Sequence, residues 1–281
     1  MLPDALQFTS PAPLVDIGAN LTHESFSADL NDVIARARQA GVTTLILTGA
    51  DRESIDAALA LCERGADGVA LHTTAGVHPH HADQWNAELA DHIRHALAQP
   101  ATVAAGECGL DYHRDLVPRS VQRRAFEAQL ELAAESGRPL FLHEREAGHD
   151  MLEMLRHWRD DIGPAVVHCF TGEQATLHGY LDLDLHIGQT GWLCDERRGQ
   201  HLREAVNDIP LNRLMVETDC PYLLPRNLPA KLKGRRHEPA LLPWIVREIA
   251  ACRGIEEAQL AHATTTTARR FFGLDEVRTH G

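Results

Sequence analysis

Long apolar runs are missing from this sequence. The longest, such as VTTLILT at residues 42–48, fall far short of the roughly 18 to 20 residues that a membrane-spanning helix needs. The first residues, MLPDALQFTSPAP, contain no Lys or Arg ahead of an apolar stretch, so they predict no secretory signal. We therefore expect a cytoplasmic protein that does not enter a membrane, with residues 1–13 as a short N-terminal extension.

Paired cysteines and positive charge are scarce as well. The six cysteines are scattered without a CxxC pair in a chain too large to depend on disulfides, which favours a reducing compartment. Lys and Arg number 27 against 40 Asp and Glu, so the net charge is −13. This balance argues against tight, nonspecific coating of duplex DNA, although it leaves room for a local basic groove.

What the chain does contain is an alternation of strand-like and helix-like segments. Its 281 residues, 44% of them hydrophobic and 24% charged, suffice for one α/β barrel with a large core. The expected strands cover residues 14–18, 42–49, 69–77, 102–106, 139–143, 164–168, 185–190 and 213–219. Helical patterns, including those at residues 27–40, 54–63, 119–136, 203–207, 239–251 and 256–272, lie around them. This order predicts a parallel (β/α)8 TIM barrel that forms one domain over residues 14–281.

Polar residues lie at or just after the ends of the expected strands. They are Asn20, His78, Glu107, His143, His168, Thr190 and Asp219. In a parallel barrel the carboxyl ends of the strands meet on one face, and that face carries the active site. These residues, although far apart in the sequence, are therefore expected to be neighbours.

Four of these residues have the chemistry of metal ligands. A lone strand-end Glu more often caps a loop, and a lone buried His more often packs in a core, but Glu107, His143, His168 and Asp219 together are hard to explain as packing. Buried imidazoles and carboxylates need a partner or a metal to offset desolvation. Nitrogen and oxygen ligands without a thiolate leave the divalent metal open, with Mg²⁺ as the first expectation and Mn²⁺ or Zn²⁺ as alternatives. Such ions activate water and neutralise a phosphoryl oxygen, which predicts phosphodiester hydrolysis.

A local positive edge is expected near Asp219. The segment PYLLPRNLPAKLKGRR contains Arg226, Lys231, Lys233, Arg235 and Arg236. The neighbouring segments add Trp192, Arg197, Arg198 and Tyr222. These charges and aromatic rings would suit the phosphates and unpaired bases of a single strand, although a solvated loop and a core tryptophan are the plainer interpretation.

Six motifs at the expected strand ends carry a resemblance to a known family. They are DIGANLT (residues 16–22), TAGVHPH (74–80), GECGLDYHR (106–114), HCFTG (168–172), TGWLCDERRG (190–199) and ETDCPYLLPR (217–226). From about residue 15 to residue 272 the chain resembles the TatD-type deoxyribonucleases of the metal-dependent hydrolase superfamily.

The resemblance implies a metal-dependent 3′-to-5′ exonuclease that acts on single-stranded DNA, and on RNA as a further substrate, with a link to the repair of damaged DNA. By position, Glu107, His143, His168 and Asp219 match the metal and catalytic residues of the family, and His78 matches a histidine that contacts phosphate. No protein partner is implied, and a monomer is the simplest expectation.

The chain departs from the family pattern in its first strand. Many relatives have an Asp-x-His-x-His motif there, and here Gly18 and Asn20 replace the two histidines. This departure predicts one firm metal site and a second, weaker, oxygen-rich site, with Asp219 either binding the weaker ion or acting as general base. A smaller departure is His237 in RRHEPA, where Asn is usual.

Two alternative functions stay open at this point. One is hydrolysis of a small amide or phosphoester by a barrel of the same superfamily, although such enzymes usually keep the strand-one histidines. The other is a catalytically decayed barrel that serves as a scaffold, which the intact set of metal-ligand residues disfavours.

Overall fold

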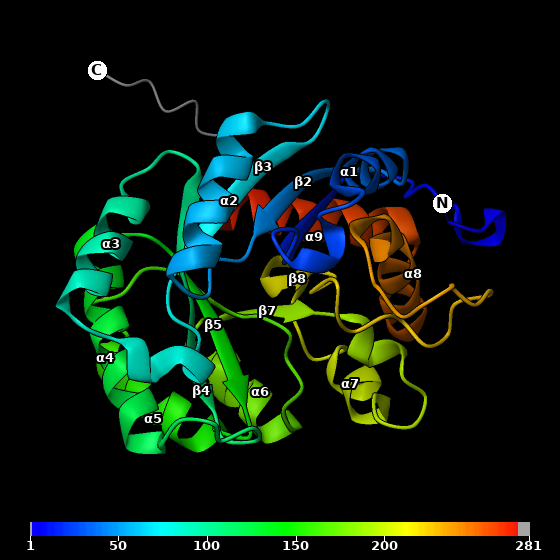
Figure 1. Ribbon diagram of the computed structural model, residues 1–281. Helices are drawn as coiled ribbons and strands as arrows, with labels where there is room; N and C mark the ends of the chain where they lie inside the picture. The colour runs from blue at the N-terminus through cyan, green and yellow to red at the C-terminus, as the bar shows by residue number, and fades with distance from the viewer. Residues whose placement is uncertain (1, 275–281) are drawn as a thin grey trace.

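The computed structural model describes residues 2–274, so residue 1 and the end of the predicted domain, residues 275–281, lie outside the described residues. Eight parallel strands form one sheet in sequence order. They are β1 (Leu14–Ala19), β2 (Val42–Leu47), β3 (Ala70–Ala75), β4 (Thr102–Asp111), β5 (Leu140–Arg145), β6 (Ala165–Val167), β7 (His186–Gln189) and β8 (Leu214–Val216). The predicted TIM barrel is confirmed, and a strand lies within or across each expected range (Figure 1).

Helices surround the barrel (Figure 1). They are α1 (Leu30–Gln39), α2 (Arg52–Arg64), α3 (Ala87–Leu97), α4 (Arg119–Ser136), α5 (Gly148–Trp158), α6 (Gln174–Asp182), α7 (Gln200–Ala205), α8 (Leu242–Arg253) and α9 (Glu257–Phe272). Helices α1 to α7 each connect two successive strands, and α8 and α9 follow β8. The short helix expected at residues 203–207 begins three residues earlier. Within residues 2–274, none of these helices is long and apolar enough to cross a bilayer.

Strand β4 is longer than its apolar pattern indicates. The expected strand stops at Gly106, whereas the observed strand continues to Asp111 and pairs there with Arg145 of β5. Gly106 and Gly109 interrupt the apolar pattern, but both have positive φ values, 133° and 145°, that glycine alone adopts readily. Glu107 therefore lies inside β4 rather than after it.

Helix α9 covers the amino ends of the strands. Phe271 and Phe272 pack in one cluster with Val15 of β1 and Met215 of β8. The hydroxyl of Thr265 donates a hydrogen bond to the carbonyl of residue 13, just before β1, at 2.8 Å. This end of the barrel is sealed by apolar contacts, and the opposite end carries the polar residues.

The barrel closes where β1 meets the end of β8. Ala19 pairs with Cys220, and the carboxylate of Asp16 accepts hydrogen bonds from the hydroxyl (2.6 Å) and the amide (2.9 Å) of Thr218. Burial raises the pKa of Asp16 to about 7, although the bonds from Thr218 oppose this shift. Asp16 therefore joins the two strands of the seam.

The N-terminal extension packs on the outside of the barrel. Leu2 and Leu6 are buried in a cluster with Ala40 and Leu241. The indole of Trp244 in α8 donates a hydrogen bond to the carbonyl of Leu6 at 3.3 Å. The described part of the extension thus covers the ends of α1 and α8.

His237, the second departure from the family pattern, is fully buried below the loop after β8. Its Nδ1 lies 2.9 Å from the carbonyl of Tyr222, to which it donates. Burial lowers the pKa of His237 to about 4, although the bond to Tyr222 opposes this shift. In the unfolded chain the side chain of His237 binds a proton near its ordinary pKa of 6.5. The contribution of neutral His237 to the free energy of unfolding is therefore fully present above pH 6.5 and is lost as the pH falls toward 4.

We expect His237→Asn to reduce this acid sensitivity. A pKa difference of roughly two to three units corresponds to about 3 kcal/mol of unfolding free energy. Urea unfolding gives the free energy of unfolding of both proteins at pH 7.5 and pH 4.5. Between these pH values the wild type should lose about 3 kcal/mol more than His237→Asn loses. His149→Asn, at an exposed histidine, is the control. Equal losses in wild type and His237→Asn would show that His237 does not carry the effect.

Candidate active site

The residues predicted for the site meet at the carboxyl ends of the strands. His78 follows β3, Glu107 lies in β4, His143 lies in β5, His168 follows β6 and Asp219 follows β8. The three histidines are within hydrogen-bond or ion-pair distance of Glu107, and Asp219 is close enough to act electrostatically on His168 and Glu107. The structure brings all five residues together.

Glu107 stands at the centre of this group. One oxygen, Oε1, lies 2.9 Å from His143 Nδ1, 2.8 Å from His168 Nε2 and 3.4 Å from His78 Nε2. Burial alone would raise the pKa of Glu107, but His78 and His168 attract its charge, and bonds from His143 and His168 help to hold the pKa well below its usual range. An ionised carboxylate with several imidazole nitrogens around it is the donor set of a divalent metal site.

Carboxylates bind the outer nitrogens of two of these histidines. His143 Nε2 lies 3.2 Å from Asp111 Oδ2, and His168 Nδ1 lies 3.2 Å from Glu217 Oε2. A neutral imidazole that donates from its outer nitrogen has a lone pair on its inner nitrogen. In that state His143 and His168 both direct a lone pair toward the centre, as metal-binding histidines do.

His78 has the opposite hydrogen-bond arrangement. Its Nδ1 accepts from the backbone amide of His80 at 3.1 Å, so the proton of the neutral ring is on Nε2, which faces Glu107 and His143. By distance alone, ligand atoms of His78, Glu107 and His143 lie within 4.8 Å of one another and could hold a metal. The hydrogen bond from His80 favours His78 as a donor toward the centre, because metal binding through Nε2 would require the other tautomer.

The three histidines also differ in pKa. Burial lowers the pKa of His78 well below its usual value. Burial acts in the same direction on His143 and His168, but bonds to Asp111 and Glu107 raise the pKa of His143, and the charges of Glu107 and Glu217 raise that of His168 well above its usual value. A neutral His78 has one ring proton, and the bond from the amide of His80 leaves that proton on Nε2.

Asp219 is held at the edge of the group by Asn20. Asn20 Nδ2 donates to Asp219 Oδ1 at 3.0 Å and to the carbonyl of Cys220 at 3.1 Å. Asp219 has a φ of 52°, a left-handed conformation that Asp tolerates better than most residues. Burial raises its pKa to about 7, while His168 opposes this shift. Asn20 therefore positions this carboxylate.

Sequence reasoning did not identify Asp111 and Glu217 as members of the site. Both are buried carboxylates, 2% and 0% exposed, although both lie in motifs that carry the family resemblance. The signal that could have found them is the period of two along a strand, since Asp111 is four residues after Glu107 and Glu217 is two residues before Asp219.

A groove is lined by the segments that follow β7 and β8, and the second of these segments continues from Asp219. Its volume is about 930 Å³. Its lining combines apolar side chains with basic ones and includes Trp192, Arg197, Leu223, Arg226, Lys231 and Arg235. Arg226 pairs with Asp195 at 3.1 Å, and the buried Nε1 of Trp192 has no hydrogen-bond partner among the described residues. Tyr222 is not part of this lining, but it is 53% exposed and meets His23 edge to ring at 5.8 Å.

Arg236 does not belong to the positive edge, contrary to the prediction. Its guanidinium binds both carboxylate oxygens of Asp29 at 2.7 Å and the carbonyl of Ser25 at 2.6 Å. It also lies over the ring of Phe26, 4.9 Å from its centroid. Because its donors are engaged with the segment that leads into α1, Arg236 anchors the loop.

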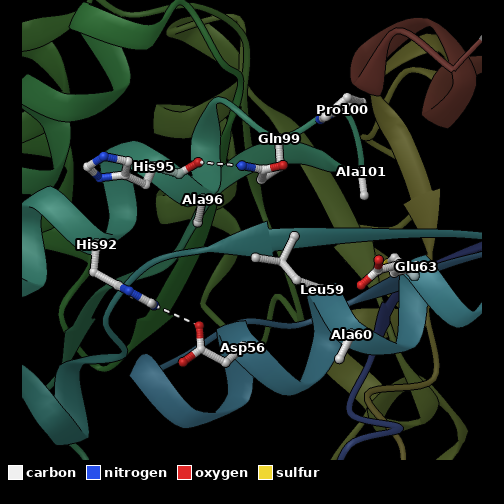
Figure 2. A pocket seen from close by; sticks show the side chains of 11 residues that line it. Asp56, Leu59, Ala60, Glu63, His92, His95, Ala96, Gln99, Pro100 and Ala101 are labelled. Atoms are coloured by element: carbon white, nitrogen blue, oxygen red, sulfur yellow. Dashed lines mark hydrogen bonds and ion pairs between the residues drawn. The ribbon is translucent and has the colours of Figure 1, made fainter.

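Another hollow lies on the outside of the barrel, between α2 and α3 (Figure 2). Its volume is about 650 Å³, and His92 Nε2 lies 3.0 Å from Asp56 Oδ1 at its edge. None of the predicted site residues lines it. It is therefore separate from the candidate active site.

A parallel barrel with His and Glu donors at the carboxyl ends of its strands is the architecture of a metal-dependent hydrolase. The chain belongs to the TatD related DNase family, whose pattern it matches over residues 15–273. The family predicted from the motifs is confirmed.

Similar proteins agree with this assignment. The chain is 46% identical over 261 residues to the 3′-5′ ssDNA/RNA exonuclease TatD of Erwinia amylovora, which covers 93% of this chain and 100% of the relative. A TatD family hydrolase from Entamoeba histolytica superimposes with a TM-score of 0.83 at 23% identity and covers 94% of this chain and 99% of its own. A TatD homolog from Escherichia coli gives 0.83 at 24% identity, with 92% and 98% coverage. At these identities the two structures show the fold alone.

Proposed function

We propose that this protein is a divalent-metal-dependent 3′-to-5′ exonuclease that acts on single-stranded DNA or RNA. The observation that carries the proposal is the convergence of His143 Nδ1 and His168 Nε2 on one oxygen of Glu107. Membership of the TatD related DNase family and 46% identity to an exonuclease of that name support the substrate. The six free cysteines are consistent with a reducing cytoplasm. The link to DNA repair and the monomeric state stay predictions.

We assign separate roles to the residues of the site. Glu107, His143 and His168 would hold the metal, and Asp219 lies next to them. A bound divalent ion supplies an activated water and neutralises charge on the phosphoryl oxygen. Asp219 takes the proton of the attacking water, while Nε2–H of His78 donates to a phosphate oxygen. Since mixed nitrogen and oxygen donors accept both hard and transition ions, Mg²⁺, Mn²⁺ and Zn²⁺ are the ions to compare.

The groove lined by the segments after β7 and β8 suits a single strand. Trp192 offers a ring for a base, and Arg197 and Arg226 offer cations for phosphates. Tyr222, between this groove and the metal residues in sequence, offers a second exposed ring. A single strand exposes its unpaired bases to such rings, whereas the bases of a duplex are stacked inside it.

Digestion of a single-stranded oligonucleotide labelled at its 5′ end tests the function. Metal-stripped protein receives Mg²⁺, Mn²⁺ or Zn²⁺, and His143→Ala is run in parallel. A metal-dependent ladder that shortens from the 3′ end, and is lost in the variant, is the expected result. If no metal restores cleavage, a panel of small esters and amides tests the alternative hydrolase, and cleavage there would replace the nuclease proposal.

Substitutions in the groove are expected to weaken binding of a single strand. Loss of one base stack costs about 1 to 3 kcal/mol, so Trp192→Ala should raise the Kd about 5- to 150-fold. Arg197→Ala removes one cation, so it should weaken binding and make the slope of log K against log salt concentration shallower by about 0.7. Fluorescence anisotropy at several salt concentrations measures both effects, with Arg38→Ala on α1 as control. Unchanged affinity in both groove variants would exclude this path for the strand.

A further inference from the structure

Glu217 directly follows β8 and is completely buried behind the site. Its two oxygens have separate partners, since Oε2 accepts from His168 Nδ1 at 3.2 Å and Oε1 accepts from the amide of Cys169 at 2.5 Å. Both partners are donors when Nδ1 carries the proton of the ring. A carboxylate satisfies both, whereas the amide of a glutamine has only one accepting atom.

The contact with Cys169 also fixes the backbone next to His168. Cys169 has a φ of 45°, in the left-handed region that a residue with a side chain adopts only when its surroundings hold it there. Glu217 accepts the amide hydrogen of this residue. The carboxylate of Glu217 therefore fixes both the ring of His168 and the backbone turn at Cys169.

Two glycines make room for Glu217. A Cβ on Gly18 of β1 would collide with Oε2, and a Cβ on Gly188 of β7 would lie 2.5 Å from Oε1. Strands β1 and β7 lie on either side of β8 in the barrel. A side chain at position 18 and this placement of Glu217 therefore exclude one another.

We propose that Glu217 is the positioning residue of the metal centre, and that its placement requires the space left by the glycine at position 18. Glu217 keeps the ring proton of His168 on Nδ1, so that Nε2, 2.8 Å from Glu107, presents its lone pair to the metal. This inference rests on the ligand set of the proposed function.

Metal titration without nucleic acid tests the proposal. Metal-stripped wild type, Glu217→Gln, Gly18→Ala and Gly163→Ala are titrated with Mn²⁺ or Zn²⁺ by calorimetry. Glu217→Gln retains the shape of the side chain but can accept from only one of the two donors, His168 Nδ1 and the amide of Cys169. Gly18→Ala retains every hydrogen-bonding group but places a methyl group where Oε2 of Glu217 lies. Both should bind metal about 10- to 100-fold more weakly, as expected for loss of an outer partner of a metal ligand. Gly163→Ala, whose Cβ would meet only ordinary contacts, should match the wild type.

Affinities within twofold of the wild type in both Glu217→Gln and Gly18→Ala would overturn the proposal. A measurement on the wild type alone covers the case in which the variants do not fold. This measurement is a nitrogen-15 NMR spectrum of the histidines in metal-loaded protein, in which the signals of His168 are assigned by their absence from His168→Gln. The protonated ring nitrogen of His168 should be Nδ1. Protonation at Nε2 would overturn the proposal. A wild type that binds metal but cleaves no oligonucleotide would contradict the exonuclease and leave the role of Glu217 intact.

Discussion

Glu107→Gln is expected to lower the rate of oligonucleotide cleavage about a thousandfold or more. Gln has nearly the same shape but no charge, and the shared oxygen of Glu107 is the point on which His143 and His168 converge. Loss of the charge removes both a metal ligand and the electrostatic complement of the metal, and such an interaction contributes several kcal/mol, where about 4 kcal/mol equals a factor of a thousand. Steady-state release of nucleotides from a 3′ end, with saturating metal, gives kcat/KM for the comparison.

Glu88→Gln is the matched control for this substitution. Glu88 lies on α3, its side chain is 85% exposed, and it pairs with Arg52 at 3.0 Å. The same chemical change there should leave cleavage unaltered. A Glu107→Gln protein that binds metal and cleaves like the control would remove Glu107 from the centre of the mechanism.

Asp219→Asn is expected to lower kcat by about a hundred- to ten-thousandfold, the usual contribution of a general base. Asn is the suitable replacement, because it tolerates the left-handed φ of 52° and its oxygen can still accept from Asn20. The substitution therefore removes the charge and the basicity while it preserves the local structure. Single-turnover cleavage and metal affinity are measured together.

The two measurements on Asp219→Asn distinguish a base from a ligand. If Asp219 acts on the attacking water, kcat falls and the metal Kd changes little. If Asp219 binds the metal, the Kd rises as well. Asp67→Asn, at a side chain that is 98% exposed, is the control. Unaltered kcat in Asp219→Asn would contradict both roles.

The fold could be predicted from the sequence because periodicity and connectivity are local properties. Short apolar runs separated by helical patterns indicate parallel strands joined by helices, and parallel strands place all their carboxyl ends on one face. The prediction was less accurate where this local signal is weak. Glycines at positions 106 and 109 hide the second half of β4, since the strand continues there through pairing with β5 and not through side-chain pattern.

The site could be predicted in part for the same reason. Glu107, His143, His168 and Asp219 stand at strand ends, and a strand end is visible in the sequence. Arg236 shows the limit of such reasoning, because its position in a basic segment indicated a phosphate contact, whereas Asp29, more than 200 residues away, engages it.

The sequence by itself determined the barrel, the family and the residues that meet at its mouth, because these follow from pattern and spacing. Only the tertiary structure decided which nitrogen of each histidine faces the centre of the group. The outer partners Asp111, Glu217 and the amide of His80 set which ring nitrogen carries the proton. A hydrogen bond between residues on different strands depends on distances that only the closed barrel establishes. For that reason the sequence could not show the bond from Asn20 to Asp219 or the space that Gly18 leaves beside Glu217.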